Sequence, residues 1–322
     1  MNHHINPWIE KYRPTSLDDI VSHNNIIKAL KNYSKNKSLP NMILYGPPGT
    51  GKTSTIISYA KQLYKEYFPN MVLELNASDD RGKNIVRITI KDFVSSYSNF
   101  CNIPFKLVIL DEVDAMTHDA QMLMRGIMEK FHNKARFCLI CNNIKDINWS
   151  LISRCIIFRF LSIPKKIITK RIKNILQKEE IEITNNALDI IYNTADGDMR
   201  TVLNICQSLK MIYEQKVSLH NVIKCFGFIT TRNLNKIIDI IINNNINTAF
   251  YLIKNIIISE SISFIDIINN ISSLLVDNIV NNENFHNIDI PYSLKKLSLL
   301  EVNYYNQINI NILISLLICV FT

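Results

Sequence analysis

The sequence predicts an α/β protein in which a parallel sheet with helices on both faces is followed by a small helical lid and an all-α C-terminal domain. In the first half of the chain, short apolar runs alternate with helical stretches, as in sheets built from βα units. Between Pro164 and Pro291 no proline occurs, and apolar residues recur with a helical period. The 322 residues are enough for two or three domains, with predicted boundaries at 1–160, 161–226 and 227–322.

Five short apolar runs are predicted as the strands of the sheet, because buried parallel strands are rich in Val, Ile, Leu and Phe. They are NMILY from Asn41, MVLELN from Met71, FKLVILD from Phe105, RFCLICN from Arg136 and CIIFRF from Cys155. Helices are predicted between them, notably over 54–67 and 120–131. Beyond the sheet, two apolar stripes predict buried helix faces: Ile168, Ile172, Ile175 and Leu176, then Met199, Val202, Leu203, Cys206 and Leu209.

Composition narrows the class of protein. The net charge of +8 and a pI near 9.0 favour a polyanionic partner such as nucleotide or nucleic acid. The 7 scattered cysteines suggest reduced thiols in an intracellular compartment. Cys138 and Cys141 form a CxxC, but it lies within an apolar run and predicts a buried strand rather than a zinc site. We expect no signal peptide or membrane anchor at the N-terminus, because the stretch MNHHINPWIEKYRP has no long apolar segment. The apolar run 312–321 is too short to cross a bilayer and predicts the last helix of a bundle.

The stretch YGPPGTGKTS fits the phosphate-loop pattern GxxxxGK[ST], with a predicted strand before it and a helix after it. Three of the chain's 7 glycines lie here, where backbone N–H groups must close around phosphate oxygens. We predict that Lys52 reaches the β- and γ-phosphates and that Thr53 binds Mg²⁺. The predicted nucleotide-binding residues of this loop are Gly46, Pro47, Pro48, Gly49, Thr50, Gly51, Lys52, Thr53 and Ser54.

A carboxylate pair ends the predicted strand LVILDEVD. Asp111 is expected to orient the water shell of the magnesium ion, and Glu112 to polarise the attacking water. A kinase or a GTPase does not need the adjacent glutamate, so the pair favours ATP hydrolysis.

Two further residues are predicted to sense the γ-phosphate. Asn142 ends the strand RFCLIC, although an asparagine at this place also suits the start of an ordinary loop. Arg200 follows Asp196, the predicted N-cap, in the first turn of a helix, where a cation opposes the helix dipole unless an anion lies beyond. A surface arginine is the alternative for Arg200.

Arg154 raises a related question, because it stands between a polar loop and an apolar run with no obvious local partner.

The ordered stretches PWIEKYRPTSLDDIV, GPPGTGKTS, ELNASDDRG, KLVILDEVDAMT, RFCLICN, SRC and GDMRTVLN resemble those of a replication factor C small subunit, an AAA+ protein of the eukaryotic sliding-clamp loader. The resemblance covers Pro7 to about Leu209. It implies an ATPase subunit that uses ATP and Mg²⁺ to open the clamp and load it onto primer–template DNA in the nucleus. Its partners would be the other subunits of a heteropentamer, the clamp and the DNA backbone, without a membrane. The final third would be the oligomerising collar.

The resemblance also implies roles for single residues. Ile9, Arg13 and Val21 would line the adenine and phosphate side of the pocket. Arg154 would be an arginine finger that reaches the ATP of a neighbouring subunit, and would then have no partner in its own chain. The alternative for Arg154 is a partly exposed arginine paired with a nearby acid.

DNA binding is predicted for three cations around a helix start: Arg81, Lys83 and Arg87. They suit contacts to the backbone of a duplex, because no aromatic side chains interleave them. A solvated charged face is the alternative interpretation.

Two departures from the family pattern bear on activity. Val113 stands where relatives usually carry alanine, and Gly126 where they commonly carry a second arginine.

Two rival functions also stay open. One is a nucleotide-binding scaffold with negligible hydrolysis. The other is a different AAA+ DNA-processing ATPase, such as a helicase loader or a branch-migration enzyme.

Overall fold

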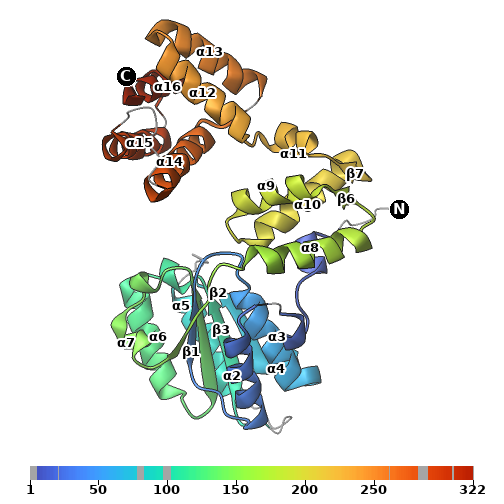
Figure 1. The fold of residues 1–322 in the computed structure, drawn as a ribbon. Coiled ribbons are helices and arrows are strands. Elements are labelled where there is room, and N and C mark those ends of the chain that lie inside the picture. The colour runs from blue at the N-terminus through green and yellow to red at the C-terminus, as the bar shows by residue number, and fades with distance from the viewer. Residues whose placement is uncertain are drawn as a thin grey trace. The chain divides into compact units, whose positions relative to one another are not determined.

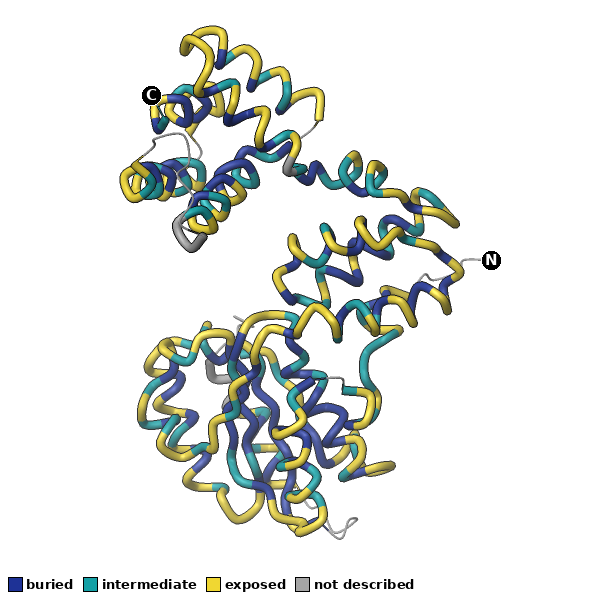
Figure 2. The backbone as a smooth tube through the Cα atoms, in the orientation of Figure 1, coloured by how far each residue is buried: buried dark blue, intermediate teal, exposed yellow. Residues whose placement is uncertain are grey.

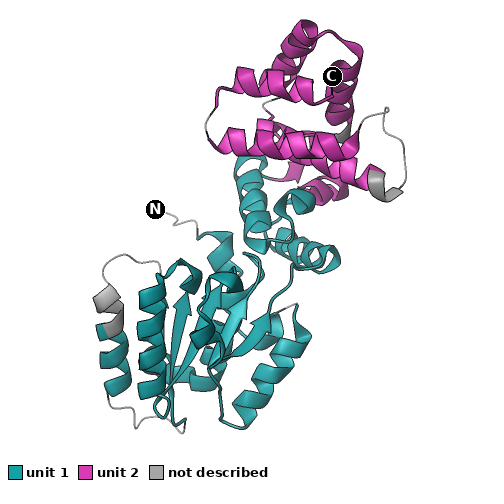
Figure 3. Cartoon of the chain, turned by 90° about the vertical axis from the view of Figure 1, so that its left-hand side faces the viewer, with its two compact units in different colours: residues 1–181, 191–214 teal, residues 182–190, 215–322 magenta. Residues whose placement is uncertain are grey.

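The computed structural model describes residues 6–20, 22–77, 83–96, 103–260, 262–281, 289–306 and 308–321; the side chains of 83–87, 231 and 279–281 are not described. The chain forms two compact units (Figure 3). One consists of 1–181 with 191–214, and the other of 182–190 with 215–322. The domain boundaries predicted at 160 and 226 stay predictions.

The first unit is built on a five-stranded parallel sheet, as predicted. Its strands are β1 (Met42–Tyr45), β2 (Val72–Asn76), β3 (Lys106–Asp111), β4 (Ala135–Cys141) and β5 (Ile156–Arg159), in the order β2-β3-β4-β1-β5. Because all strands run in one direction, their carboxyl ends meet at one edge, where ligands of such sheets bind. The phosphate loop and Asn142 follow strands at this edge, and Asp111 is the last residue of β3.

Helices cover both faces of the sheet (Figure 1). Side chains of alternate residues enter separate cores: Met42 and Leu44 pack in the core shared with α2 (Asn24–Lys35) and α3, while Ile43 packs in the core shared with α5, α6 and α7. Strands β1, β3 and β4 are therefore mostly buried (Figure 2). The prediction of a buried strand is wrong for β5, because it lies at the edge of the sheet and Ile156 and Ile157 are exposed. The remaining bounds are α3 Lys52–Tyr64, α4 Phe68–Met71, α5 Lys83–Ser95, α6 His118–Lys130 and α7 Trp149–Ile152.

The predicted helices deviate only at their ends. The helix predicted over 54–67 begins at Lys52, continues to Tyr64 and ends in the 3₁₀ turn η2 (Lys65–Tyr67); the helix predicted over 120–131 spans His118–Lys130. Further 3₁₀ turns are η1 (Leu17–Asp19), η3 (Val113–Ala115) and η4 (Ile144–Asp146). Cys138 and Cys141 are buried in β4, which confirms the strand prediction for this CxxC.

Helices of the predicted lid complete the first unit, with α1 (Trp8–Lys11) packed against one of them. They are α8 (Lys165–Lys178), the end of α9 (Asn185–Ala195) and α10 (Met199–Tyr213). The backbone N–H of Trp8 donates to Gln207 Oε1 of α10 at 2.9 Å. The predicted stripes are confirmed except at Met199, which is only half-buried at the start of α10. The other members are all buried: Ile168, Ile172, Ile175, Leu176, Val202, Leu203, Cys206 and Leu209.

The second unit is mainly helical. Its bundle consists of α12 (Thr231–Asn243), α13 (Ile246–Ser259), α14 (Phe264–Asn281), α15 (Ile290–Tyr305) and α16 (Ile310–Phe321), joined in one apolar core. Buried Leu313 and Leu317 confirm that the apolar C-terminal run is the last helix of a bundle. The unit also holds α11 (Leu219–Phe226) and a short parallel pair that the sequence did not predict, β6 (Glu182–Ile183) with β7 (Lys216–Val217). Over the described residues, none of the helices has the length and hydrophobicity needed to span a bilayer.

Candidate nucleotide-binding site

The phosphate loop follows a path that requires glycine. It leaves β1 at Tyr45 and enters α3 at Lys52, and Gly46, Gly49 and Gly51 have φ of 147°, 66° and 93°. A Cβ atom on Gly46 would lie 2.0 Å from the carbonyl oxygen of Phe160, and one on Gly49 would lie 1.5 Å from Asp198 Oδ1. The loop therefore packs closely against Phe160, just after β5, and against Asp198, just before α10.

Lys52 is a buried cation whose contacts are neutral. Its side chain reaches back over the loop, and Nζ donates to the carbonyl oxygens of Gly46 at 2.7 Å and Pro47 at 2.9 Å. A third bond, at 2.9 Å, goes to Asn142 Oδ1 at the tip of β4. Burial lowers the pKa of Lys52. None of these contacts neutralises the ammonium group, so the loop suits an anion such as a phosphate.

Thr53 and Asp111 form the candidate metal site. Thr53 Oγ1 donates to Asp111 Oδ2 at 2.7 Å, and Asp111 Oδ1 accepts the backbone N–H of Glu112 at 2.9 Å. A hydroxyl and a carboxylate in contact present the oxygen ligands that Mg²⁺ prefers. The side chain of the next residue, Glu112, is exposed, and its backbone is in the left-handed region with φ of 56°. The residues present therefore fit the predicted ion.

Asp114 is a site residue that the sequence analysis missed. Its Oδ2 accepts the backbone N–H groups of Asn142 at 2.8 Å and Asn143 at 3.1 Å. These bonds fix the tip of β4, so that the Asn142 side chain meets Lys52. The only sequence signal was its place as the third acidic residue of the run DEVD.

A cavity of about 370 Å³ lies beside the loop. Seven predicted nucleotide-binding residues that line it are Ile9, Arg13, Gly49, Thr50, Gly51, Thr53 and Ser54, and Arg200 of α10 is an eighth. Lid residues that the analysis did not assign to the pocket also line it: Ile163, Ile168, Arg171, Met199 and Leu203. Val21 lies outside the described residues, and its neighbour Ser22 is at the cavity wall. Five predicted nucleotide-binding residues lie outside the cavity lining: Gly46, the exposed Pro47 and Pro48, Lys52 and Asn142.

The start of α10 corrects one prediction. The N-cap is Asp198, whose Oδ1 accepts the backbone N–H groups of Arg200 at 2.7 Å and Thr201 at 3.4 Å, and not Asp196. Asp196 has a φ of 44° and Gly197 one of 82°, so the chain turns there and the helix begins later. The shift places α10 directly at the phosphate loop.

The N-terminal wall of the cavity is tied to the lid by charged groups. Arg171 of α8 donates to the carbonyl oxygens of Asp19 at 2.7 Å and Tyr12 at 2.9 Å. Glu179, just after α8, accepts hydrogen bonds of 2.5 Å from Lys11, Tyr12 and Lys210. Burial alone would raise the pKa of Glu179, but these bonds outweigh it and hold the pKa at about 2. The carboxylate therefore joins the segment next to Ile9 to α8 and α10.

We expect Glu179→Gln to destabilise the first unit by about 2 kcal/mol at neutral pH, since bonds to a charged group are lost. The folded-state pKa lies below the ordinary value of 4.5. This stability is therefore complete above about pH 4.5 and declines as the pH falls toward 2. Melting temperatures of wild type and variant should differ most near pH 7 and converge as the pH approaches 2. A difference that does not change with pH would contradict the assignment.

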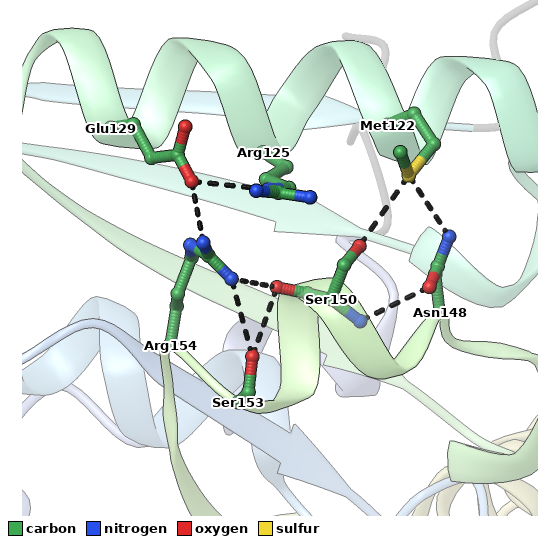
Figure 4. A network of polar contacts seen from close by, with 7 residues as sticks. All are labelled: Met122, Arg125, Glu129, Asn148, Ser150, Ser153 and Arg154. Atoms are coloured by element: carbon green, nitrogen blue, oxygen red, sulfur yellow. Dashed lines mark hydrogen bonds and ion pairs between the residues drawn. The ribbon is translucent and has the colours of Figure 1, made fainter.

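Arg154 corrects a second prediction, because it has a partner in its own chain. It lies two residues after α7, where Nη2 pairs with Glu129 Oε1 of α6 at 2.6 Å and Nη1 donates to the carbonyl oxygen of Ser150 at 2.8 Å (Figure 4). Its side chain is still 34% exposed. The expectation of an unpaired arginine is wrong, and the finger role stays a prediction.

The predicted DNA-binding cations stay untested. Lys83 and Arg87 lie in the first half of α5, but their side chains are not described, and Arg81 lies outside the described residues.

Known proteins match this chain in sequence. The model of the ATPase family associated with various cellular activities (AAA) matches residues 42–163. Replication factor C subunit 3 of Saccharomyces cerevisiae is 39% identical over 300 residues, which cover 90% of this chain and 88% of that protein. The chain belongs to the replication factor C subunits. Replication factor C subunit 5 of Homo sapiens is 40% identical over 90% of this chain and 82% of that protein.

Membership of the replication factor C family, with its AAA domain, makes this chain a clamp-loader ATPase subunit of DNA replication. A solved structure of the Thermotoga maritima RuvB Holliday junction branch migration motor has a TM-score of 0.56, with 18% identity over 77% of this chain and 88% of that one. At this identity the likeness supports the AAA+ fold alone. The rival branch-migration function has weaker support from sequence, since the identity to the RuvB motor is 18% and the identity to the yeast replication factor C subunit is 39%.

Proposed function

We propose that this chain binds ATP with Mg²⁺ at its phosphate loop and hydrolyses it when a neighbouring subunit supplies an arginine. The observation that carries the proposal is the buried Lys52 ammonium group, held by neutral acceptors beside the Thr53–Asp111 pair. The backbone N–H groups of the loop and Lys52 would hold the phosphates. The apolar wall that contains Ile9 and Ile168 would take the adenine.

The chain's own residues divide the remaining work. Thr53 and Asp111 would hold Mg²⁺, which supplies charge neutralisation at the phosphates. Glu112, which is exposed and directly follows β3, would orient the attacking water. Asn142, fixed between Lys52 and Asp114, would hold that water or a γ-phosphate oxygen. Arg200, in the first turn of the lid helix α10, would contact the γ-phosphate and bring the lid toward it.

The same proposal assigns partners. Arg154 would act on the ATP of the adjacent subunit, so hydrolysis requires the hetero-oligomer of replication factor C subunits. The isolated chain should be nearly inert. ATP binding would order the assembly so that it opens the sliding clamp and holds primer–template DNA in the nucleus, with Arg81, Lys83 and Arg87 on the DNA backbone. Capture of the clamp by the assembled complex would separate this function from that of another AAA+ motor.

We expect Lys52→Ala to weaken ATP binding by about 10- to 100-fold, because charge-assisted hydrogen bonds to phosphate are lost. The measurement is anisotropy of a fluorescent ATP analogue titrated with the isolated chain in the presence of Mg²⁺. Lys130→Ala removes an exposed lysine at the end of α6 and serves as the matched control. Equal affinities for the Lys52 variant and wild type would refute the proposed phosphate site.

A nucleotide-binding scaffold without hydrolysis remains the second candidate function. The engagement of Arg154 within its own chain does not decide between this function and the ATPase, because the proposed target of Arg154 is the ATP of the adjacent subunit. Measuring ATP hydrolysis at this chain's own site within the assembled complex distinguishes the ATPase from the scaffold, because only the ATPase turns over there.

A further inference from the structure

One face of α6 is directed at the segment that carries Arg154. Met122, Arg125 and Glu129 follow a spacing of three and four residues, so they share this face of the helix (Figure 4). Met122 Sδ accepts hydrogen bonds from Asn148 Nδ2 at 3.2 Å and Ser150 Oγ at 3.5 Å. The helix therefore contacts the short helix α7 at its start and reaches Arg154 beyond its end.

A buried glutamine fixes the start of α7 more firmly. Gln121 is 2% exposed, and its Nε2 donates to the carbonyl oxygen of Asp146 at 2.9 Å. Its Oε1 accepts the backbone N–H of Asn148 at 2.6 Å. The side-chain amide of Gln121 thus bonds the backbone through its N–H group and through its oxygen, and these two bonds fix the backbone before α7 against α6. The backbone after Arg154 is held as well, since the N–H of Ile156 donates to the carbonyl oxygen of Asn41 at 2.8 Å. The position of the Arg154 side chain then depends on its own contacts.

The guanidinium group of Arg154 is held on two sides. Nη1 donates to the Ser150 carbonyl oxygen at 2.8 Å and to Ser153 Oγ at 3.2 Å, and Nη2 pairs with Glu129 Oε1 at 2.6 Å. The same oxygen of Glu129 accepts from Arg125 Nε at 3.0 Å. The hydrogen bond from Arg125 lowers the pKa of Glu129, so the carboxylate is charged at neutral pH. One anion thus joins two cations that would otherwise repel each other.

We infer that Glu129 is a positioning residue that holds the Arg154 guanidinium group in the orientation in which it acts on a nucleotide outside this chain. The inference rests on the proposed finger role of Arg154. A guanidinium group has five N–H donors, and the contacts above engage Nη1 and one hydrogen of Nη2. Nε–H and the second hydrogen of Nη2 remain for a phosphate oxygen. A long side chain held in advance loses less freedom when it meets the phosphate.

The test compares Glu129→Ala, Arg154→Ala and the double variant in the reconstituted loader. Turnover is measured at the single ATP site that Arg154→Ala silences, with the other sites inactivated. We expect Glu129→Ala to lower kcat there by about 2- to 5-fold, the range that a partly exposed ion pair can supply, with little change in KM. The double variant should be no slower than Arg154→Ala alone, because Glu129 acts only through Arg154. Glu129→Gln keeps the acceptor oxygen and should recover part of the rate.

Glu66→Ala is the matched control, since it removes an exposed glutamate from η2 of the same unit and should leave kcat unchanged. Equal melting temperatures would exclude a folding defect. If Arg154→Ala lowers turnover and Glu129→Ala does not, the positioning role is wrong while the finger role stands. If Glu129→Ala raises turnover, the carboxylate restrains Arg154 instead of presenting it, and the inference is overturned. If Arg154→Ala has no effect at any site, the finger role itself is wrong.

Discussion

Replacing Glu112 by glutamine is expected to lower ATP hydrolysis at this subunit's site by about 10²- to 10⁴-fold, the usual contribution of a general base. The substitution keeps the size and shape of the side chain and removes the negative charge that attracts the proton of water. Nucleotide binding should survive, because the structure places Lys52 and Thr53, and not Glu112, on the phosphate loop. The variant should therefore change kcat and leave KM nearly unchanged.

The measurement requires that this site be the one that turns over. We would assemble the loader with the other active subunits carrying the corresponding glutamine, and follow phosphate release with clamp and primer–template DNA present. Asp119→Asn serves as a control, because it removes an exposed carboxylate from the first turn of α6. Unchanged turnover in the Glu112 variant would favour the scaffold function over the ATPase.

The sheet and the phosphate loop were predictable because their signals are local. Each strand is an uninterrupted apolar run, and the loop is a contiguous pattern whose glycines have the positive φ angles that the pattern requires. The position of Asn142 beside the phosphate loop was also predictable, since the ends of parallel strands meet at one edge of the sheet. Its contact with Lys52 follows from that topology.

The contacts that the sequence analysis missed join residues far apart in the chain. Asp114 holds the backbone of Asn142, Glu129 holds Arg154, and Glu179 binds Lys11, at separations of 28, 25 and 168 residues. No periodicity or composition marks such a carboxylate, because its neighbours are set by the packing of helices on the sheet. The wrong N-cap has a different cause. Asp196 and Asp198 both suit an N-cap, and only the turn at Gly197 decides between them.

Arg154→Ala in this subunit is expected to lower turnover at the adjacent subunit's site by about 10³- to 10⁵-fold, the range for arginine fingers in related NTPases. Binding of nucleotide at this chain's own site should not change, because Arg154 lies after α7 and pairs with α6. The pair with Glu129 does not argue against the role. Both side chains are partly exposed, so solvent and salt weaken this ion pair more than they would weaken a phosphate contact in a closed interface.

Arg154→Lys distinguishes a finger from a mere positive charge. Lysine keeps the charge but lacks the planar fork that contacts a carboxylate and a phosphate together, so most of the loss should remain. Arg232→Ala, which removes an exposed arginine of α12, controls for the change in net charge. The readout is phosphate release from a loader in which the adjacent site alone is active, alongside ATP binding at this chain's own site. If the lysine variant keeps full activity, charge alone suffices, and the oriented guanidinium group that Glu129 holds in Figure 4 has no part in the reaction.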